Sequence, residues 1–439
     1  MKIPMLWDPR SQMHSSPTMP RAPRVMLLGY NGANNTGAEA LLLADIEDVR
    51  AVLGPEAIIT VPTLNPQNLR RYVQEGPNLR IAQFPSLFFL ELRRLVRQHD
   101  LVILVEGSSY MDTWGSALLL AFLWATRCAQ NAHVPCLAYA VDAGQLSARN
   151  QFLIRREASK TDLIVTRSAA AAQRLRFWGV HAPIESTADN AFTFRPSDAD
   201  ARLLQREWPE AASGVVGLAV VDFFLWPVVM RPWGRTEDCY RWPYYFSRSQ
   251  DRRRASLELA QNYANLADLI VEEHGRSVAL LGMEQVDESL ATAIQQRMHH
   301  PEKARVFSSR VYDASQMTVL LRGLDLLVTS RYHASVLSLA AAVPQVAVGH
   351  DLRLLSLYCE LDLADEYFLD RCSPSVFESL RDRVDRLLRE PGLQQHKLRQ
   401  GHEEHLHSAQ RNRQLLRSFA ASRGFVTTPV LAEKAEVAA

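Results

Sequence analysis

From Arg24 onward, short apolar runs alternate with stretches in which apolar residues recur at helical spacing. This alternation is typical of βα units packed around a parallel sheet. Helical patterns over residues 37–52 and 116–131 lie between the runs. In the first half of the chain we predict buried strands over residues 24–28, 57–61, 101–105, 136–140 and 163–165.

A second series of apolar runs begins near Val215 and predicts a second sheet, with strands over residues 215–221, 278–281, 324–328 and 345–348. Between the first two, Leu259, Tyr263 and Ile270 recur at helical spacing, and Gly275 is a plausible end of that helix. We therefore predict an α/β protein in which two doubly wound, Rossmann-like domains face a cleft. Ligands are expected at the carboxyl ends of the strands.

The domain organisation follows from these patterns. We expect a disordered extension over residues 1–22, an N-terminal Rossmann-like domain over 23–200, and a C-terminal one over 201–375. C-terminal helices over 376–426 and a flexible tail over 427–439 complete the chain.

Composition narrows the class of protein. The 439 residues carry a net charge of +1, so the chain lacks the large positive charge that is typical of nucleic-acid-binding proteins. Five cysteines form no C-x-x-C pair, which favours a reducing compartment over a disulfide framework or a zinc ribbon. No apolar window reaches the roughly 18 residues of a membrane span, and the N-terminus lacks the apolar run of a signal peptide. We expect a cytoplasmic protein.

A glycine-rich turn follows the first predicted strand and opens a helix, a context that can hold an anion. It is not G-x-G-x-x-G. Gly32 and Gly37 have P-loop spacing, but Ala38 and Glu39 stand where Lys and Ser or Thr would contact phosphate and magnesium, which argues against an NTPase. Two interpretations remain. Either the glycines serve only the backbone conformation of a tight turn, or the turn lines the cleft and Asn34, Asn35 and Thr36 offer polar groups to a ligand.

Arg331 and His333 follow the strand predicted over residues 324–328 and precede an Ala-rich helix. A planar guanidinium suits a phosphate or carboxylate, and histidine can move a proton near neutral pH. The alternative is that Arg331 pairs with a structural carboxylate while His333 caps or packs. One strand later, Asp351 and Arg353 are expected at the same rim, unless they form an ordinary surface turn.

At these motifs the chain resembles the polysaccharide pyruvyl transferases. The shared segments are the Asn-Thr-Gly turn with its acidic residue at 32–39, the Arg-x-His-Ala turn at 331–334, and residues 349–353, where Arg353 replaces a common Lys. The resemblance implies a GT-B-like fold. It also implies transfer of a pyruvyl group from phosphoenolpyruvate to two hydroxyls of a sugar, giving a cyclic ketal and phosphate. Phosphoenolpyruvate would be a co-substrate, and no cofactor or metal ion is expected.

The chemistry of that donor suggests roles for individual residues. Its carboxylate and phosphate require a cationic cradle, for which Arg331 is the first choice and Arg167 and Arg353 the second. His333 would move a proton, and Glu106 or Asp142 would act as the base. The remaining donor-binding candidates are Gly32, Asn34, Asn35, Thr36 and Gly37 of the glycine turn.

Acceptor binding is expected from an aromatic and arginine-rich segment over residues 223–254, because aromatic faces stack on sugar rings. Trp226, Trp233 and Tyr244 are the candidates, together with Asp112. A packed insertion or a subunit contact would explain the same aromatics, and turn formation or capping would explain the carboxylates. The histidines near residue 402 do not form H-E-x-x-H, and we expect a polar helix there rather than a metal site.

The leading prediction is a transferase of exopolysaccharide or cell-envelope biosynthesis, acting on a sugar or lipid-linked glycan, without nucleic acid. Peripheral association with the inner face of the membrane and an oligomeric state are left open. Two alternatives remain at this point: a GT-B nucleotide-sugar glycosyltransferase, and a non-catalytic glycan-binding protein.

Overall fold

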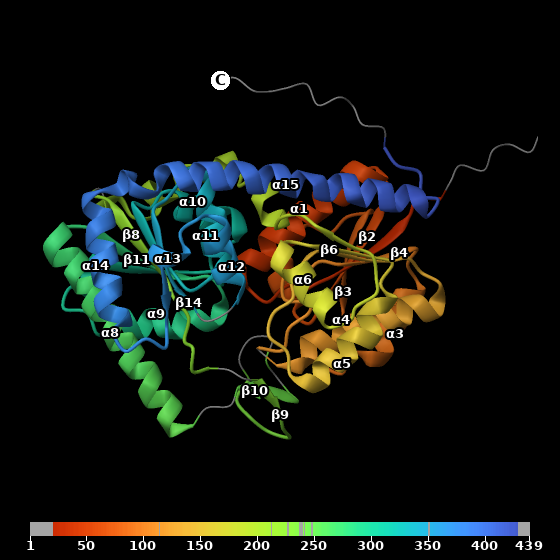
Figure 1. Cartoon of the computed structure of the whole chain (residues 1–439), viewed down its shortest axis with the longest axis horizontal. Helices are drawn as coiled ribbons and strands as arrows, with labels where there is room; N and C mark the ends of the chain where they lie inside the picture. Colours follow the sequence, from red (N-terminus) through yellow and green to blue (C-terminus); the bar gives the residue numbers. More distant parts are fainter. Residues whose placement is uncertain are drawn as a thin grey trace, which may run out of the picture.

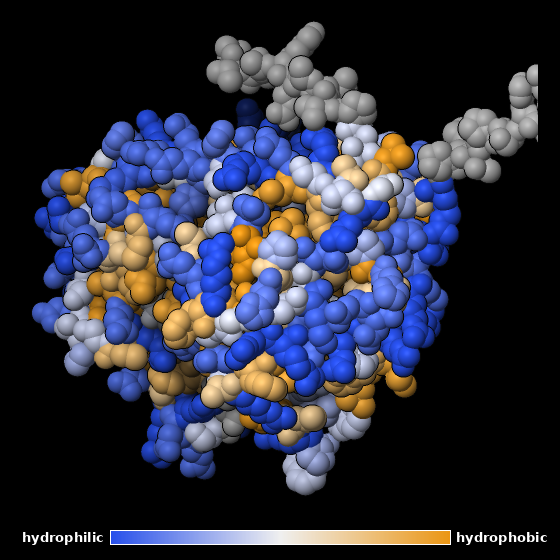
Figure 2. Space-filling view, turned by 45° about the vertical axis from the view of Figure 1, so that its right-hand side comes forward, coloured by the Kyte–Doolittle hydropathy of each residue, from blue (hydrophilic) through white to orange (hydrophobic). Residues whose placement is uncertain are grey.

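A computed structural model describes residues 21–428 except 114, 212, 226–227, 237–239, 241, 247–248 and 350–351. The extension expected over residues 1–22 and the tail expected over 427–439 lie almost wholly outside the described residues. Among the described helices, none combines the length and the apolar composition that crossing a bilayer requires. Figure 2 shows one face of the molecule, mostly hydrophilic with interspersed hydrophobic residues.

The N-terminal domain is a seven-stranded parallel sheet in the order β3-β2-β1-β4-β5-β6-β7. The strands are β1 Arg24–Leu28, β2 Ile58–Thr63, β3 Leu79–Gln83, β4 Leu101–Leu104, β5 Cys136–Val141, β6 Leu163–Thr166 and β7 Ile184–Ser186. The helices are α1 Thr36–Leu53, α2 Pro66–Leu69, α3 Phe89–Arg97, α4 Ser116–Ala132, α5 Ala148–Glu157 and α6 Ala169–Phe177.

The C-terminal domain repeats this plan with six parallel strands in the order β12-β11-β8-β13-β14-β15. The strands are β8 Val215–Ala219, β11 Ser277–Gly282, β12 Ala304–Ser308, β13 Leu326–Thr329, β14 Gln345–Gly349 and β15 Phe368–Asp370. The helices are α7 Leu203–Glu207, α8 Gln250–His274, α9 Glu288–Gln295, α10 Ala314–Arg322, α11 Tyr332–Ser338, α12 Leu352–Glu360, α13 Ala364–Tyr367 and α14 Val376–Arg389.

This architecture confirms the predicted fold class, and it fixes where a ligand should bind. In both sheets the strand order reverses beside a central strand, at β1 and β4 in the first sheet and at β8 and β13 in the second. Crevices in open α/β sheets form outside the carboxyl ends of strands at such points. The glycine turn follows β1 and the Arg-x-His turn follows β13, so each lies at a predicted crevice.

A hairpin leaves the C-terminal domain between β8 and α8. Its antiparallel strands are β9 Val228–Met230 and β10 Tyr244–Phe246. In Figure 1 the hairpin hangs below the two domains, near the space between them. The position that a Cβ would occupy on Gly115, just before α4, lies 3.1 Å from the Val228 carbonyl. The hairpin therefore reaches the N-terminal domain.

The last helix, α15 Gln395–Ser422, crosses both domains (Figure 1). Leu398 is buried in the core of the C-terminal domain, whereas Leu416 and Phe419 are buried in the core of the N-terminal domain. Between them, the Asn412 amide donates to the Ala188 carbonyl at 3.0 Å. The polar C-terminal stretch thus forms a helix that ties the domains together.

Helix α1 belongs to one domain, but its first turn packs into the other. Glu39 is 1% exposed, and one of its carboxylate oxygens accepts the backbone N–H of Ala314 at the start of α10. Burial raises the pKa of Glu39 to about 8, and Arg71 only partly opposes this shift. The folded protein therefore binds a proton at Glu39 more tightly than the unfolded chain does.

The pH dependence of stability tests this contact. Because the folded pKa is the higher one, we expect the free energy of unfolding to fall as pH rises from about 5 to about 8. The slope should be at most about 1.4 kcal/mol per pH unit. Glu39→Gln keeps the acceptor for Ala314 and removes the titration, so its denaturant unfolding should lack this slope. Equal slopes for both proteins would contradict the assignment.

Candidate active site

The glycine turn is held against the C-terminal domain by backbone hydrogen bonds. The Thr36 N–H donates to the Met283 carbonyl at 2.9 Å, and the Gln285 N–H donates to the Asn34 carbonyl at 3.0 Å. Asn35 and Glu284 thereby form an antiparallel bridge between the domains. This bridge places residues just after β1 beside residues just after β11.

The polar side chains of the turn mostly serve that contact. The Asn34 amide donates to Gln285 at 2.6 Å and accepts from Arg71 at 2.6 Å. Asn35 caps α1 by accepting the Ala38 N–H at 3.1 Å. Asn34 and Thr36 are buried away from the cavity, whereas Asn35 and Gly37 line it. Of the three polar residues that we expected to face a ligand, only Asn35 lines the cavity.

The Arg-x-His turn meets the glycine turn. A Cβ on Gly37 would lie 2.0 Å from Nδ1 of His333, so only glycine leaves room for the imidazole. The other ring nitrogen, Nε2, lies 3.5 Å from a carboxylate oxygen of Asp189. The His333 ring is thus fixed between the start of α1 and a buried carboxylate, with its side chain 14% exposed.

Arg331 is held by two carboxylates. Its guanidinium donates to both oxygens of Asp287 and to Glu284, the latter at 2.9 Å. Burial raises the pKa of Asp287 to about 6, although Arg331 pulls it down. Arg331 nevertheless lines the cavity, as does Glu284. An anionic ligand at Arg331 would have to compete with Glu284 for the guanidinium.

Arg167 and Asp142 do not line the cavity. The Arg167 side chain is completely buried and forms ion pairs with Asp142 at 2.8 Å and Asp189 at 2.6 Å. It also lies over the Tyr332 ring, 4.0 Å from the centroid. Burial alone would raise the pKa of Asp189, but Arg167 and His333 outweigh it and hold that pKa far below its usual value. Arg167 and Asp142, for which the sequence suggested donor and base roles, instead support Asp189 behind His333.

Glu106 occupies the end of β4 and faces the cavity. Its carboxylate accepts the Tyr30 N–H at 3.3 Å and the Ser108 hydroxyl at 2.9 Å. The Tyr30 hydroxyl in turn donates to Glu284 at 3.1 Å. A chain of polar contacts therefore runs from β4 of the first domain to the loop after β11 of the second.

These groups line a cavity of about 480 Å³ between the domains. Seven of the site residues predicted from the sequence line this cavity: Arg331, His333, Glu106, Arg353, Asn35, Gly37 and Tyr244. Gly32, which has a φ of 73°, shapes the turn without facing the cavity. The described part of the lining therefore carries two arginines, a histidine and two glutamates.

The remaining predicted residues lie elsewhere. Asp112 accepts three hydrogen bonds from Ser147 and Asn150, so it organises the loop before α5 and is not among the lining residues. Trp233 is 76% exposed and also lies outside the lining. Trp226 falls outside the described residues.

Sequence reasoning missed Glu284, Asp287 and Asp189. The first two follow the strand that was predicted over residues 278–281. The expectation that ligands bind at the carboxyl ends of strands, applied to this strand as well, would have identified them. Asp189 follows β7, a three-residue strand with no recognisable apolar run. Its contact with His333 becomes visible only in the folded structure.

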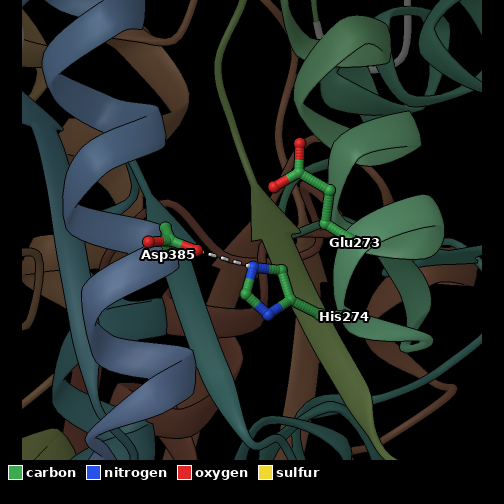
Figure 3. Close-up of side chains that lie close together, drawn as sticks. All are labelled: Glu273, His274 and Asp385. Carbon is green, nitrogen blue, oxygen red and sulfur yellow. Dashed lines mark ion pairs between the residues drawn. The ribbon is translucent and has the colours of Figure 1, made fainter.

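One group of three potential metal ligands occurs among the described residues, at the end of α8 and on α14 (Figure 3). His274 Nε2 lies 3.2 Å from Asp385, while Glu273 is exposed. Asp385 is also paired with Arg389 at 2.9 Å. The close approach of His274 to Asp385 joins the two helices.

Comparisons with known proteins agree with this fold. The sequence model of the family described as polysaccharide pyruvyl transferase matches residues 35–351. No curated protein matches the sequence as a relative. A putative UDP-N-acetylglucosamine 2-epimerase from Listeria monocytogenes has a similar structure, with a TM-score of 0.59, 12% identity, and coverage of 92% of this chain and 98% of that one.

Two further solved structures have the same fold. The trehalose 6-phosphate synthase from Burkholderia multivorans gives a TM-score of 0.54 at 12% identity, covering 92% of this chain and 99% of that one. UDP-GlcNAc 2-epimerase from Neisseria meningitidis, bound to UDP-GlcNAc, gives 0.55 at 7% identity, covering 91% and 99%. At these identities the likeness concerns the fold alone.

The contact between Gly37 and His333 can be tested by stability. In a helix alanine is otherwise favoured over glycine by about 1 kcal/mol, so a loss on Gly37→Ala would report the clash. We expect a loss of about 1–3 kcal/mol in denaturant unfolding. In a His333→Ala background the loss should shrink by at least about 1 kcal/mol.

Gly76→Ala is the matched control, because a Cβ at Gly76 meets nothing within 4 Å. Its free energy of unfolding should stay within about 0.5 kcal/mol of the parent. An additive double mutant would show that the two residues do not touch.

Proposed function

Because the chain belongs to the polysaccharide pyruvyl transferase family, we propose that it moves a pyruvyl group from phosphoenolpyruvate to two hydroxyls of a sugar. The products would be a cyclic pyruvate ketal on a glycan or glycan precursor and inorganic phosphate. We further propose that the reaction serves exopolysaccharide or cell-envelope synthesis in the cytoplasm or at the inner face of the membrane.

One observation carries the proposal: His333 and Arg331 line a single cavity with Gly37 and Glu106, which come from the other domain. A small donor with a carboxylate and a phosphate can be gripped there by guanidinium groups from the ends of β13 and β14. A proton donor and a carboxylate base are then within the same enclosure. Closing such a site between two domains also keeps water from the activated donor.

The donor methylene gains a proton and becomes the methyl group, while the two sugar oxygens form bonds to C2 and the bond between C2 and the phosphate oxygen breaks. Of the two hydroxyl protons released, one balances the proton taken by the methylene and the other leaves with phosphate. His333 is our candidate for the proton transfer to the methylene or the departing phosphate, and Glu106 for the acceptance of a hydroxyl proton.

Asp189 acts through His333 in this scheme and is a positioning residue. A buried carboxylate beside an imidazole fixes the orientation of the ring and stabilises its protonated form. Arg167 prevents Asp189 from taking up the proton itself, because it holds the pKa of that carboxyl low. In this proposal the imidazole, and not Asp189, carries the proton.

The identity of the donor substrate distinguishes the proposed pyruvyl transferase from a nucleotide-sugar glycosyltransferase. Phosphate release from phosphoenolpyruvate and nucleotide release from UDP-N-acetylglucosamine can be assayed side by side with galactose-, mannose- and N-acetylhexosamine-type acceptors. We expect acceptor-dependent phosphate release. Nucleotide release alone would replace the proposal, and sugar binding without either release would indicate a glycan-binding protein.

His333→Ala should reduce phosphate release by about 10²–10⁴-fold, the usual contribution of a general acid or base. The control is His181→Ala, which removes an exposed histidine outside the cavity and should leave the rate unchanged. Thermal unfolding of both variants checks that the fold is retained. A folded His333→Ala protein with the parent rate would remove His333 from the mechanism.

A further inference from the structure

The two carboxylates that share Arg331 lie in different places. Asp287 is buried, is not among the described residues of the cavity lining, and also accepts the backbone N–H of Glu284 at 3.0 Å. Glu284 lines the cavity, and its carboxylate accepts the Arg331 guanidinium at 2.9 Å. Asp287 is therefore a fixed partner of Arg331 within the protein, whereas Glu284 is a partner that a ligand in the cavity can reach.

The backbone of Glu284 is fixed, while its carboxylate has a second partner. The interdomain bridge to Asn35 holds the backbone. The other carboxylate oxygen accepts the Tyr30 hydroxyl at 3.1 Å, and the hydroxyls of Tyr30 and Tyr240 lie 3.1 Å apart. Both tyrosines line the cavity. A Glu284 carboxylate that moves off Arg331 therefore keeps a hydrogen-bond donor within reach, which lowers the cost of its displacement.

The formal charges of the described lining cancel. Glu106 and Glu284 are negative, Arg331 and Arg353 are positive, and the sum is zero with His333 neutral. Arginines bind phosphate and carboxylate groups through charge-assisted hydrogen bonds. An anion that approaches Arg331 is also repelled by the Glu284 carboxylate on the same guanidinium, and this repulsion is strong in a partly enclosed site. Glu284 therefore weakens the attraction of the cavity for any anion.

Weak anion binding is useful where a product is itself an anion. Inorganic phosphate carries the same oxyanion group as a phosphorylated donor, so a cavity that binds this group very tightly also retains the product. Binding energy that is equal in all bound states lowers KM without raising kcat. A donor with a carboxylate and a phosphate can contact Arg331 and Arg353 together, since both line the cavity, whereas phosphate has one anionic group.

We propose that Glu284 is an internal competitor for anions at Arg331, which prevents the cavity from retaining inorganic phosphate after turnover. Its carboxylate moves off the guanidinium when an anionic group of the donor binds there, and returns when phosphate leaves. The identity of phosphate as the product rests on the proposed function, whereas the competition rests on the contacts of Glu284. Glu284 takes no part in the making or breaking of bonds.

Calorimetric titration with inorganic phosphate and with phosphoenolpyruvate, without an acceptor, tests the competition. Glu284→Gln removes the charge but keeps an oxygen that can accept from Arg331 or Tyr30. We expect both anions to bind this variant at least about tenfold more tightly than the parent. The loss of a merely structural contact would weaken binding instead, so the direction of the change separates the two roles.

Glu284→Asp is the second variant, for use if thermal unfolding shows that Glu284→Gln is not folded. Residue 284 is the N-cap of a short helical turn, a position that aspartate favours. The shorter side chain draws the carboxylate back from Arg331, so both anions should again bind more tightly, by a smaller factor. Unchanged or weaker anion binding in the folded variant would overturn the proposal.

Glu288→Gln is the matched control, because it removes the same charge from the start of α9, outside the cavity. It keeps an acceptor for the Ser308 hydroxyl. Both anions should bind it within about twofold of the parent, since solvent screens a charge that is not in contact with the ligand. Equal gains in the Glu284 and Glu288 variants would reflect net charge alone and would overturn the proposal. The same holds if neither anion binds the parent or the Glu284 variants.

Turnover separates this inference from the proposed function. In the phosphate-release assay, Glu284→Gln should lower KM for phosphoenolpyruvate and strengthen inhibition by added phosphate, each by about tenfold, without raising kcat. Phosphate release by the parent, with unchanged anion binding in Glu284→Gln, would refute the competition alone. Tighter anion binding in the variant, with no phosphate release by the parent, would refute the proposed function and leave the competition standing.

Discussion

The close approach of His333 to Gly37 is the constraint on which the rest of the site depends. A methyl group between them would overlap the imidazole. The approach exists because the turn after β1 pairs with the loop after β11, and because α15 places side chains in the cores of both domains. Groups from two separate sheets therefore converge on one cavity, and the arrangement of its lining is a consequence of how the domains dock.

Charge in this region is arranged in layers. Facing the cavity, Arg331 is shared by Glu284 and Asp287, and on the far side of His333 Arg167 joins Asp142 to Asp189. Buried ion pairs of this kind contribute little net stability, yet removing one partner leaves a costly unpaired charge. We infer that they persist because they fix positions, Asp189 beside His333 and Glu284 beside Arg331.

Periodicity in the sequence was enough to predict two doubly wound sheets, because buried parallel strands such as residues 101–105 read as continuous apolar runs. The rule that ligands bind at strand ends then found Arg331, His333 and Glu106. The same rule was misleading for Arg167. Its charge and its position after β6 suggested a ligand contact, but its side chain is completely buried. Short edge strands such as β7 lacked an apolar run, so Asp189 stayed hidden, and the polar sequence of α15 gave no sign that it joins the domains.

A crystal structure of the chain soaked with phosphoenolpyruvate would show where the donor binds. We predict the donor in the interdomain cavity that Gly37 and His333 line, with its reacting carbons beside the His333 imidazole and its anionic groups at Arg331 or Arg353. Donor bound outside this cavity, or bound inside it with His333 turned away towards the protein interior, would contradict the account.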